Sequence, residues 1–223
     1  MKKTVDLILF RIFWLFLVIL SPLAFCQAQI SIGLSGGGGF TQSTGFRAAI
    51  PVEIDLRKSL YLFGGPAFIQ RRNQEVVRKL SFMRDYLSAE MDYFSFPVLI
   101  KARLEWQPIR IYGMVGLELN YGLRIQATGL EDQRLFKERL DFEQIEISRF
   151  DGGFLVGGGF EADLRGRRKI FADLRYYQGL TDIDPSPLGE IYNEGLYVTL
   201  GFIMPLFKRK LNQSKKDFKT LRH

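Results

Sequence analysis

The sequence alternates between apolar and polar or small residues over long stretches, and a period of two predicts β-strands. In residues 46–57, apolar side chains at even positions alternate with a face that carries Arg47, Glu53 and Asp55. Similar segments follow one another along the chain, at residues 30–40, 46–57, 60–70, 94–104, 109–124, 150–164, 169–177 and 196–206. Residues 60–70 are apolar on both sides, so the pattern assigns no faces to this strand.

The connections between these strands alternate in length, which predicts their topology. Short polar turns occupy residues 57–59, 105–108 and 165–168, whereas long polar segments span residues 71–92, 126–149 and 181–194. Short turns at one rim and long loops at the other are typical of an outer-membrane barrel. The predicted fold is therefore all-β, an eight-stranded antiparallel up-and-down transmembrane β-barrel that follows a cleaved signal peptide.

The first long segment, residues 71–92, allows two local structures. Val76, Leu80, Met83 and Leu87 fall at helical spacing, which would fit a short amphipathic helix. An extension of the strands beyond the membrane is the alternative, and we prefer it.

Alternation alone does not say which face of a barrel points inward, because a soluble lipocalin-like barrel has the same period. The polar face here is rich in glycine and serine, which suits the narrow lumen of eight strands better than a solvated surface. Aromatic residues near the strand ends fit an interfacial belt (Phe40, Phe46, Phe94, Tyr121, Phe150 and Tyr176). We therefore favour a membrane barrel with a polar lumen.

Charged residues on the polar face occur with both signs, and a lumen of low dielectric tolerates them when they are paired. The candidates for ion pairs in the lumen are Arg47, Glu53, Asp55, Lys101, Arg103, Arg110, Glu118, Arg124, Glu161, Asp163, Asp173 and Arg175.

The N-terminal segment is typical of a secretory signal peptide. Lys2 and Lys3 precede an apolar run that ends at Pro22, and Cys26-Gln27-Ala28 offers a cleavage site. A retained membrane anchor is disfavoured because the run is short of about 20 residues. Lipidation of Cys26 is disfavoured because bulky Phe25 precedes it. The expected domains are a signal peptide (1–28), a barrel (29–207) and a basic periplasmic tail (208–223).

The location of the positive charge excludes one class of partner. The formal net charge is +7, but the expected signal peptide contributes Lys2, Lys3 and Arg11 against Asp6, and residues 208–223 carry seven basic residues and one acid. The body between them is close to neutral, so nucleic-acid binding by the folded domain is not expected.

The sequence offers little material for catalysis. Its single histidine is His223, at the end opposite the long loops. Glu161 and Asp163 could act as an acid and base pair, although ion pairing with arginines in the lumen is favoured. No metal-binding motif is present, and the acidic segment 182–190 fits a solvated loop better than a calcium site. We expect no enzyme activity, no metal and no cofactor.

The stretch "RFDGGFLVGGGFEADL", followed by "IFADLRYYQGLTDID" and "GLYVTLGFIMPLF", resembles the closing strands of the PorT-like outer-membrane β-barrel family. "DYFSFPVLIKARLEW" is similar to another strand of that family. The resemblance implies a location in the cell outer membrane, with both mature termini periplasmic, and a link to protein secretion. Such barrels usually end at an aromatic residue, but here Phe207 precedes the tail.

The expected function is that of a structural or interaction protein with a plugged lumen. Its expected partners are outer-membrane lipids, the barrel-assembly machinery and envelope or secretion proteins that contact the long external loops. A narrow small-solute channel is the main alternative, and an enzyme that modifies lipids or peptides is a weaker one.

Overall fold

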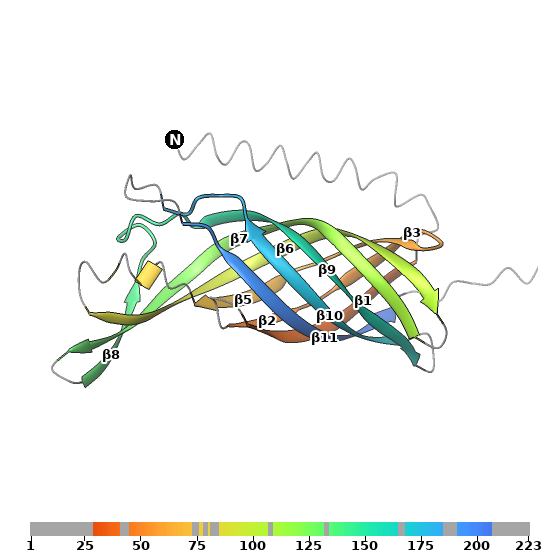
Figure 1. Ribbon diagram of the computed structural model, residues 1–223, viewed down its shortest axis with the longest axis horizontal. Coiled ribbons are helices and arrows are strands. Elements are labelled where there is room, and N and C mark those ends of the chain that lie inside the picture. Colours follow the sequence, from red (N-terminus) through yellow and green to blue (C-terminus); the bar gives the residue numbers. More distant parts are fainter. Residues whose placement is uncertain are drawn as a thin grey trace, which may run out of the picture.

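The computed structural model describes residues 29–40, 45–72, 76–77, 80, 85–106, 109–131, 134–164, 168–184 and 191–206. These residues form one antiparallel sheet of eleven strand segments that closes on itself (Figure 1). The segments are β1 (Ile30–Gly39), β2 (Phe46–Ala49), β3 (Val52–Arg57), β4 (Leu60–Gly64), β5 (Ala67–Arg72), β6 (Tyr86–Trp106), β7 (Ile109–Glu131), β8 (Arg134–Leu140), β9 (Phe150–Leu164), β10 (Arg168–Gly179) and β11 (Glu194–Pro205).

The eleven segments make a ring of only eight strands, because two strands are each divided into two segments and β8 is not part of the ring. β2 and β3 both pair with β1, while β4 and β5 both pair with β6, so each of these two pairs forms one interrupted strand. β8 pairs with β7 alone, and β1 pairs with β11 to close the ring. The structure is a closed eight-stranded antiparallel β-barrel, as the alternating pattern predicts.

The structure shows which face of the third strand points into the barrel, although both faces are apolar. Tyr61, Phe63, Ala67 and Ile69 are buried inside the barrel, whereas the intervening residues of β4 and β5 lie on the outer face. The strand is interrupted at Gly65, whose φ of 121° few other residues adopt.

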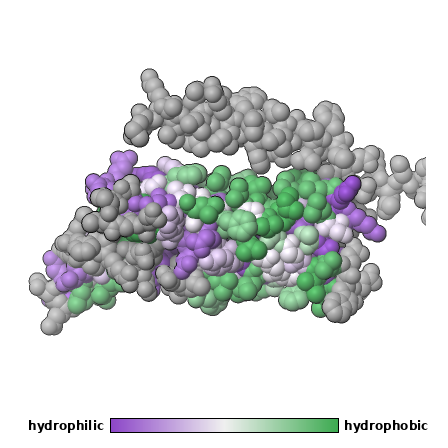
Figure 2. All heavy atoms as spheres, turned by 45° about the horizontal axis from the view of Figure 1, so that its top comes forward, coloured by the Kyte–Doolittle hydropathy of each residue, from purple (hydrophilic) through white to green (hydrophobic). Residues whose placement is uncertain are grey.

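Apolar side chains cover the outside of the barrel, and aromatic ones gather at its loop-side end. Figure 2 shows apolar residues over much of the wall and polar residues toward the two ends. On adjacent strands, Phe68 pairs with Phe94, Phe94 pairs with Tyr121, and Tyr121 pairs with Phe150. Phe46 adds its ring 5.5 Å from that of Phe68. We call these five residues the aromatic belt, because such a row marks the boundary of the hydrocarbon layer.

The two long segments at residues 71–92 and 126–149 both contain strand. β6 already begins at Tyr86, so the preferred strand extension is present; Val76, Val77 and Leu80 are nevertheless helical. The expectation of a loop from residue 126 is wrong, because β7 runs to Glu131 and pairs with β8 as a hairpin. This hairpin projects beyond the barrel at the left of Figure 1.

Several sequence predictions concern residues outside the described ranges. The signal peptide at 1–28, Phe207 and the basic tail at 208–223 all belong to this group. Among the described residues, no helix has the length and apolar character needed to cross a membrane.

Candidate functional site

The half of the lumen nearest the short turns holds a compact group of charges, which we call the turn-side cluster. Glu53 on β3 is its centre, and it accepts hydrogen bonds from Lys101 (2.8 Å), Arg103 (3.0 Å) and Lys169 (2.7 Å). Lys101 also donates to Glu161 on β9 at 2.7 Å, and Arg103 donates to the same carboxylate at 3.0 Å. Ion pairs therefore join four strands around the lumen, namely β3, β6, β9 and β10.

The turn-side cluster is removed from water. Glu53 is fully buried, and Lys101 has 1% of its side chain exposed. Aromatic rings complete the enclosure, since the Lys101 ammonium lies 4.0 Å from the ring centre of Tyr112 and the Arg103 guanidinium lies 3.9 Å from that of Tyr61. Buried ion pairs with several hydrogen bonds hold their geometry firmly, and removal of one partner leaves a costly unpaired charge.

The half of the lumen nearest the loops holds a second group, the loop-side cluster, formed by Arg47, Arg71, Glu118 and Asp151. Arg71 on β5 is its centre and donates to Glu118 (3.1 Å), Asp151 (3.0 Å) and the hydroxyl of Tyr197 (2.8 Å). Arg47 on β2 donates to the other oxygen of Glu118 at 2.7 Å. All four charged side chains are almost completely buried.

Neutral polar groups and rings surround the loop-side cluster. The guanidinium of Arg71 lies 4.1 Å from the ring centre of Tyr177, within the range of a cation–π contact. Asp151 accepts further hydrogen bonds from Asn193 (2.9 Å) and Asn120 (3.3 Å). A side chain at Gly153 would collide with the Tyr177 ring, so glycine makes room for this arrangement.

An apolar layer fills the lumen around the charges. The ring of Phe63 lies 5.3 Å from the Lys101 ammonium and 5.3 Å from the Arg175 guanidinium. Arg175 is paired with Asp173, to which the Tyr112 hydroxyl also donates. The buried cluster that fills this layer contains Phe63, Leu99, Tyr112, Met114, Leu155, Phe171 and Ile203. The lumen is therefore packed like a protein interior, with more apolar side chains than the alternation predicts.

The structure brings most of the predicted lumen residues together. The turn-side and loop-side clusters contain Glu53, Lys101, Arg103, Glu161, Arg47 and Glu118, while Arg175 and Asp173 form a buried pair of their own. Arg110 and Asp163 pair at the turn-side rim at 2.6 Å, where half of the Asp163 side chain is exposed. Asp55 is half-buried beyond the turn-side cluster.

Arg124 lies at the loop-side surface instead of in the lumen. Half of its side chain is exposed, and it pairs with Asp92. A register shift between Asp92 and Tyr93 leaves Leu123 without a partner on β6, and this extra residue reverses the alternation beyond it.

The sequence interpretation misses three members of the clusters, Arg71, Asp151 and Lys169. It places Arg71 in the first long loop, although this residue continues the odd-numbered inward face of Ala67 and Ile69. Asp151 and Lys169 also lie on inward faces, and the same alternation could have found them. Within the described ranges, no group of side chains is arranged to hold a metal ion.

Beyond the aromatic belt, on the side of the long loops, the loop segments and the extended strands share a hydrophobic core. Val76, Leu80 and Phe142 are completely or almost completely buried there, together with Met91 and Ile125 of the extended strands. The ring of Tyr86 meets that of Phe136 on β8 edge to face, and its hydroxyl donates to Glu138 of the same strand. The described loop-side residues thus form a folded structure that continues the barrel.

The projecting sheet ends in an exposed edge. The backbone N–H of Leu130 donates to Asp85 on the β6 side, so Gly129 and alternate residues of β7 face β8. By the same alternation, the backbone groups of Leu135, Lys137 and Arg139 point away from β7. No strand in the described part of the chain pairs with this edge.

Comparison with known proteins supports a membrane location. The family model described as "Outer membrane protein beta-barrel domain" matches residues 27–184. No curated protein sequence matches the chain.

Three solved structures are similar to the chain over most of its length, at low sequence identity. The N-terminal β-barrel domain of Pseudomonas aeruginosa OprF has 11% identity and a TM-score of 0.44, with 80% of this chain and 97% of that chain covered. Neisserial surface protein A has 13% identity and a TM-score of 0.47, with 79% of this chain and 96% of that chain covered. A major outer membrane protein from Thermus thermophilus has 12% identity and a TM-score of 0.47, with 80% of this chain and 99% of that chain covered.

Proposed function

Because the chain belongs to the outer membrane protein beta-barrel domain family, we propose that it is a plugged barrel that presents a folded loop-side surface to other envelope proteins. The long loops face the cell exterior and both mature termini face the periplasm, the usual orientation of such barrels. The resemblance to PorT-like barrels suggests that the partners include components of protein secretion.

The observation that carries this proposal is the projecting sheet of β6, β7 and β8. Beyond the aromatic belt it exposes Leu135 and its cross-strand neighbour Leu130, with 70% and 41% of their surface accessible. An exposed strand edge with apolar side chains is a common template for the addition of a partner strand. This part of the molecule has the features of an interaction surface.

Charge on β8 selects between two kinds of partner. Arg134, Lys137 and Arg139 are exposed on this strand. Two copies of β8 in antiparallel contact would bring these cations together, which is unfavourable. An extended segment that carries acidic residues would pair with them, so the proposed partner is a different protein with such a segment.

A photoreactive amino acid in place of Leu135 is expected to form a covalent adduct with a second protein in intact cells. The reason is that this side chain stands on the unpaired edge, within reach of any strand that docks there. The matched control places the same group at Leu200, which has a similar exposure of 64% but lies on the lipid-facing wall. Protein adducts at Leu200 and none at Leu135 would contradict the proposed surface.

The packed lumen supports the proposal that the barrel does not conduct. Purified protein in a planar bilayer is expected to show no steady openings, since the two charged clusters and the apolar layer fill the interior. Steady openings by a preparation that keeps its heat-dependent gel mobility would instead favour the small-solute channel.

We also propose that the barrel is not an enzyme. Glu161, a member of the candidate acid and base pair, is held by Lys101 and Arg103, and Asp163 is held by Arg110. Carboxylates that are engaged in ion pairs of this kind suit a structural role better than proton transfer. An activity lost on replacement of Glu161 in a barrel that remains folded would overturn this view.

A further inference from the structure

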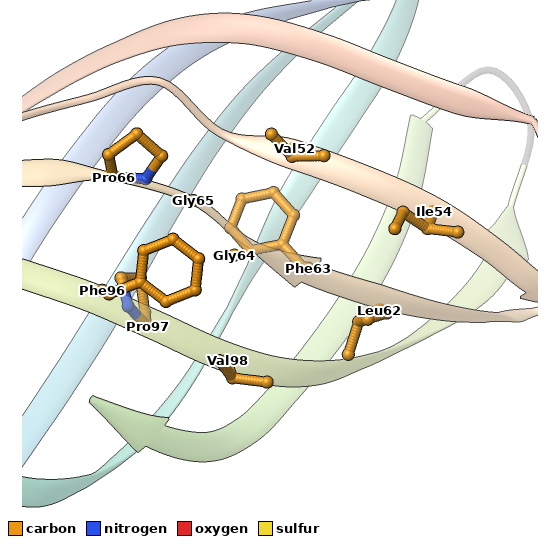
Figure 3. Close-up of a pocket in the computed structure, with 10 residues that line it drawn as sticks. All are labelled: Val52, Ile54, Leu62, Phe63, Gly64, Gly65, Pro66, Phe96, Pro97 and Val98. Carbon is orange, nitrogen blue, oxygen red and sulfur yellow. The ribbon is translucent and has the colours of Figure 1, made fainter. Parts of the chain in front are cut away.

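The outer wall of the barrel contains an apolar pocket where the third strand is interrupted. The pocket has a volume of about 190 Å³ and lies between β3, β4 and β6 (Figure 3). Its lining includes Val52 on one side, Phe96 and Val98 on the other, and Gly64 and Pro66 between them. All of these side chains are apolar.

Local backbone geometry produces this hollow. Gly64 occupies an outward position without a side chain, and a Cβ there would collide with the backbone carbonyl of Pro97 on β6. Gly65 has a positive φ and Pro66 lacks a backbone N–H, so the sheet cannot continue smoothly from β4 to β5. The hollow therefore arises from the backbone at the interruption of the third strand.

The position of the pocket determines what surrounds it. Phe96 and Val98 stand two and four residues from Phe94 of the aromatic belt, on the barrel side, which places them roughly 7–13 Å along the strand. Because strands of such barrels are tilted by about 35–45°, the depth below the belt is smaller than this distance, and it lies inside a hydrocarbon layer about 30 Å thick. The groups that reach the pocket in the membrane are therefore lipid tails or parts of a neighbouring membrane protein.

The size and chemistry of the pocket favour a lipid tail. An α-helix has a diameter of about 10 Å, too wide to enter a hollow of this volume. An empty hollow would forfeit dispersion contacts along its lining, whereas a hydrocarbon chain restores them without any polar group to desolvate. We propose that this pocket binds one fatty acyl chain of a membrane lipid and holds it longer than the rest of the wall does. This inference depends on the membrane location, and is independent of the partner that the loops bind.

Retention of lipid by the mature barrel tests this proposal. The probe is phosphatidylglycerol, supplied in nanodiscs from which the protein is released for native mass spectrometry. The wild-type barrel is expected to retain one phospholipid. Val98→Phe fills the pocket and is expected to lower the fraction that retains a lipid at least tenfold. Val198→Phe is the matched control, because Val198 is an outward-facing valine on β11 with 40% exposure, and it should retain lipid as the wild type does.

Other outcomes would overturn the proposal. Equal retention by Val98→Phe and the wild type would show that the pocket holds no lipid. A wild-type dimer that Val98→Phe converts to a monomer would show that a second copy fills it. Heat-dependent gel mobility checks that each variant is folded, and Ile54→Phe, which fills the pocket from β3, replaces Val98→Phe if that variant fails to fold.

Discussion

Replacement of Arg71 by methionine is expected to lower the free energy of unfolding of the barrel by about 3–5 kcal/mol. Arg71 supplies the cation that contacts Asp151, and it shares Glu118 with Arg47. Methionine fills a similar volume but leaves a buried carboxylate without this counter-charge. Urea unfolding in detergent or lipid, followed by loss of heat-dependent gel mobility, measures the change.

The neighbouring residue provides the control for this prediction. Arg72 has the same side chain, but it points outward and pairs with Glu90, with 44% and 32% of the two side chains exposed. Arg72→Met is expected to change stability by no more than about 1 kcal/mol, because solvent screens an exposed pair.

A double variant separates charge from packing. If the penalty of Arg71→Met comes from the unpaired Asp151, Asp151→Asn in the same chain should recover a large part of it. Additive losses in the double variant, or equal losses for Arg71→Met and Arg72→Met, would contradict the assigned role of Arg71.

Replacement of Glu53 by glutamine is expected to destabilise the barrel by a similar amount, about 3–5 kcal/mol. Glu53 contacts Lys101 and Arg103 on β6 and Lys169 on β10, so loss of its charge removes a counter-ion from three cations, and of these only Lys101 and Arg103 also contact Glu161. Glutamine keeps the shape and removes only the charge. The same unfolding assay measures the effect.

The rim pair is the control for Glu53. Asp163→Asn removes a carboxylate from the same end of the barrel, but the Asp163 side chain is 49% exposed and its partner Arg110 is 23% exposed. We expect a change below about 1 kcal/mol for Asp163→Asn. A Glu53→Gln barrel as stable as the Asp163→Asn barrel would show that the turn-side cluster does not hold the strands together.

The alternating pattern is sufficient to predict the barrel and most of its inward charges. A period of two reports directly on which side chains share a face, so Arg47, Glu53, Lys101 and Glu161 can be placed without any coordinates. The reason is that every strand that spans the membrane must keep its apolar face toward the lipid. This requirement produces an unbroken alternation of apolar and polar residues in the sequence.

The pattern fails where that constraint ends. The third strand is apolar on both sides because its inward residues, such as Phe63 and Ile69, belong to buried apolar clusters. β8 alternates weakly, since one of its faces is solvated and carries Leu135 beside Lys137. The bulge that moves Arg124 to the surface adds a single residue and so exchanges the two faces of β7 beyond it. The sequence does not reveal this change, because apolar residues continue at the odd positions Leu123, Ile125 and Ala127.

The seam between β1 and β11 has a consequence for the order of assembly. It joins the first and the last strands of the described chain, from Ser31 beside Pro205 to Gly39 beside Tyr197. Contacts between such distant segments are the slowest to form, and until they do, both strands present open hydrogen-bonding edges to their surroundings. We therefore expect closure to be a late event in assembly. A factor that assists insertion would have to shield both edges until β11 pairs with β1.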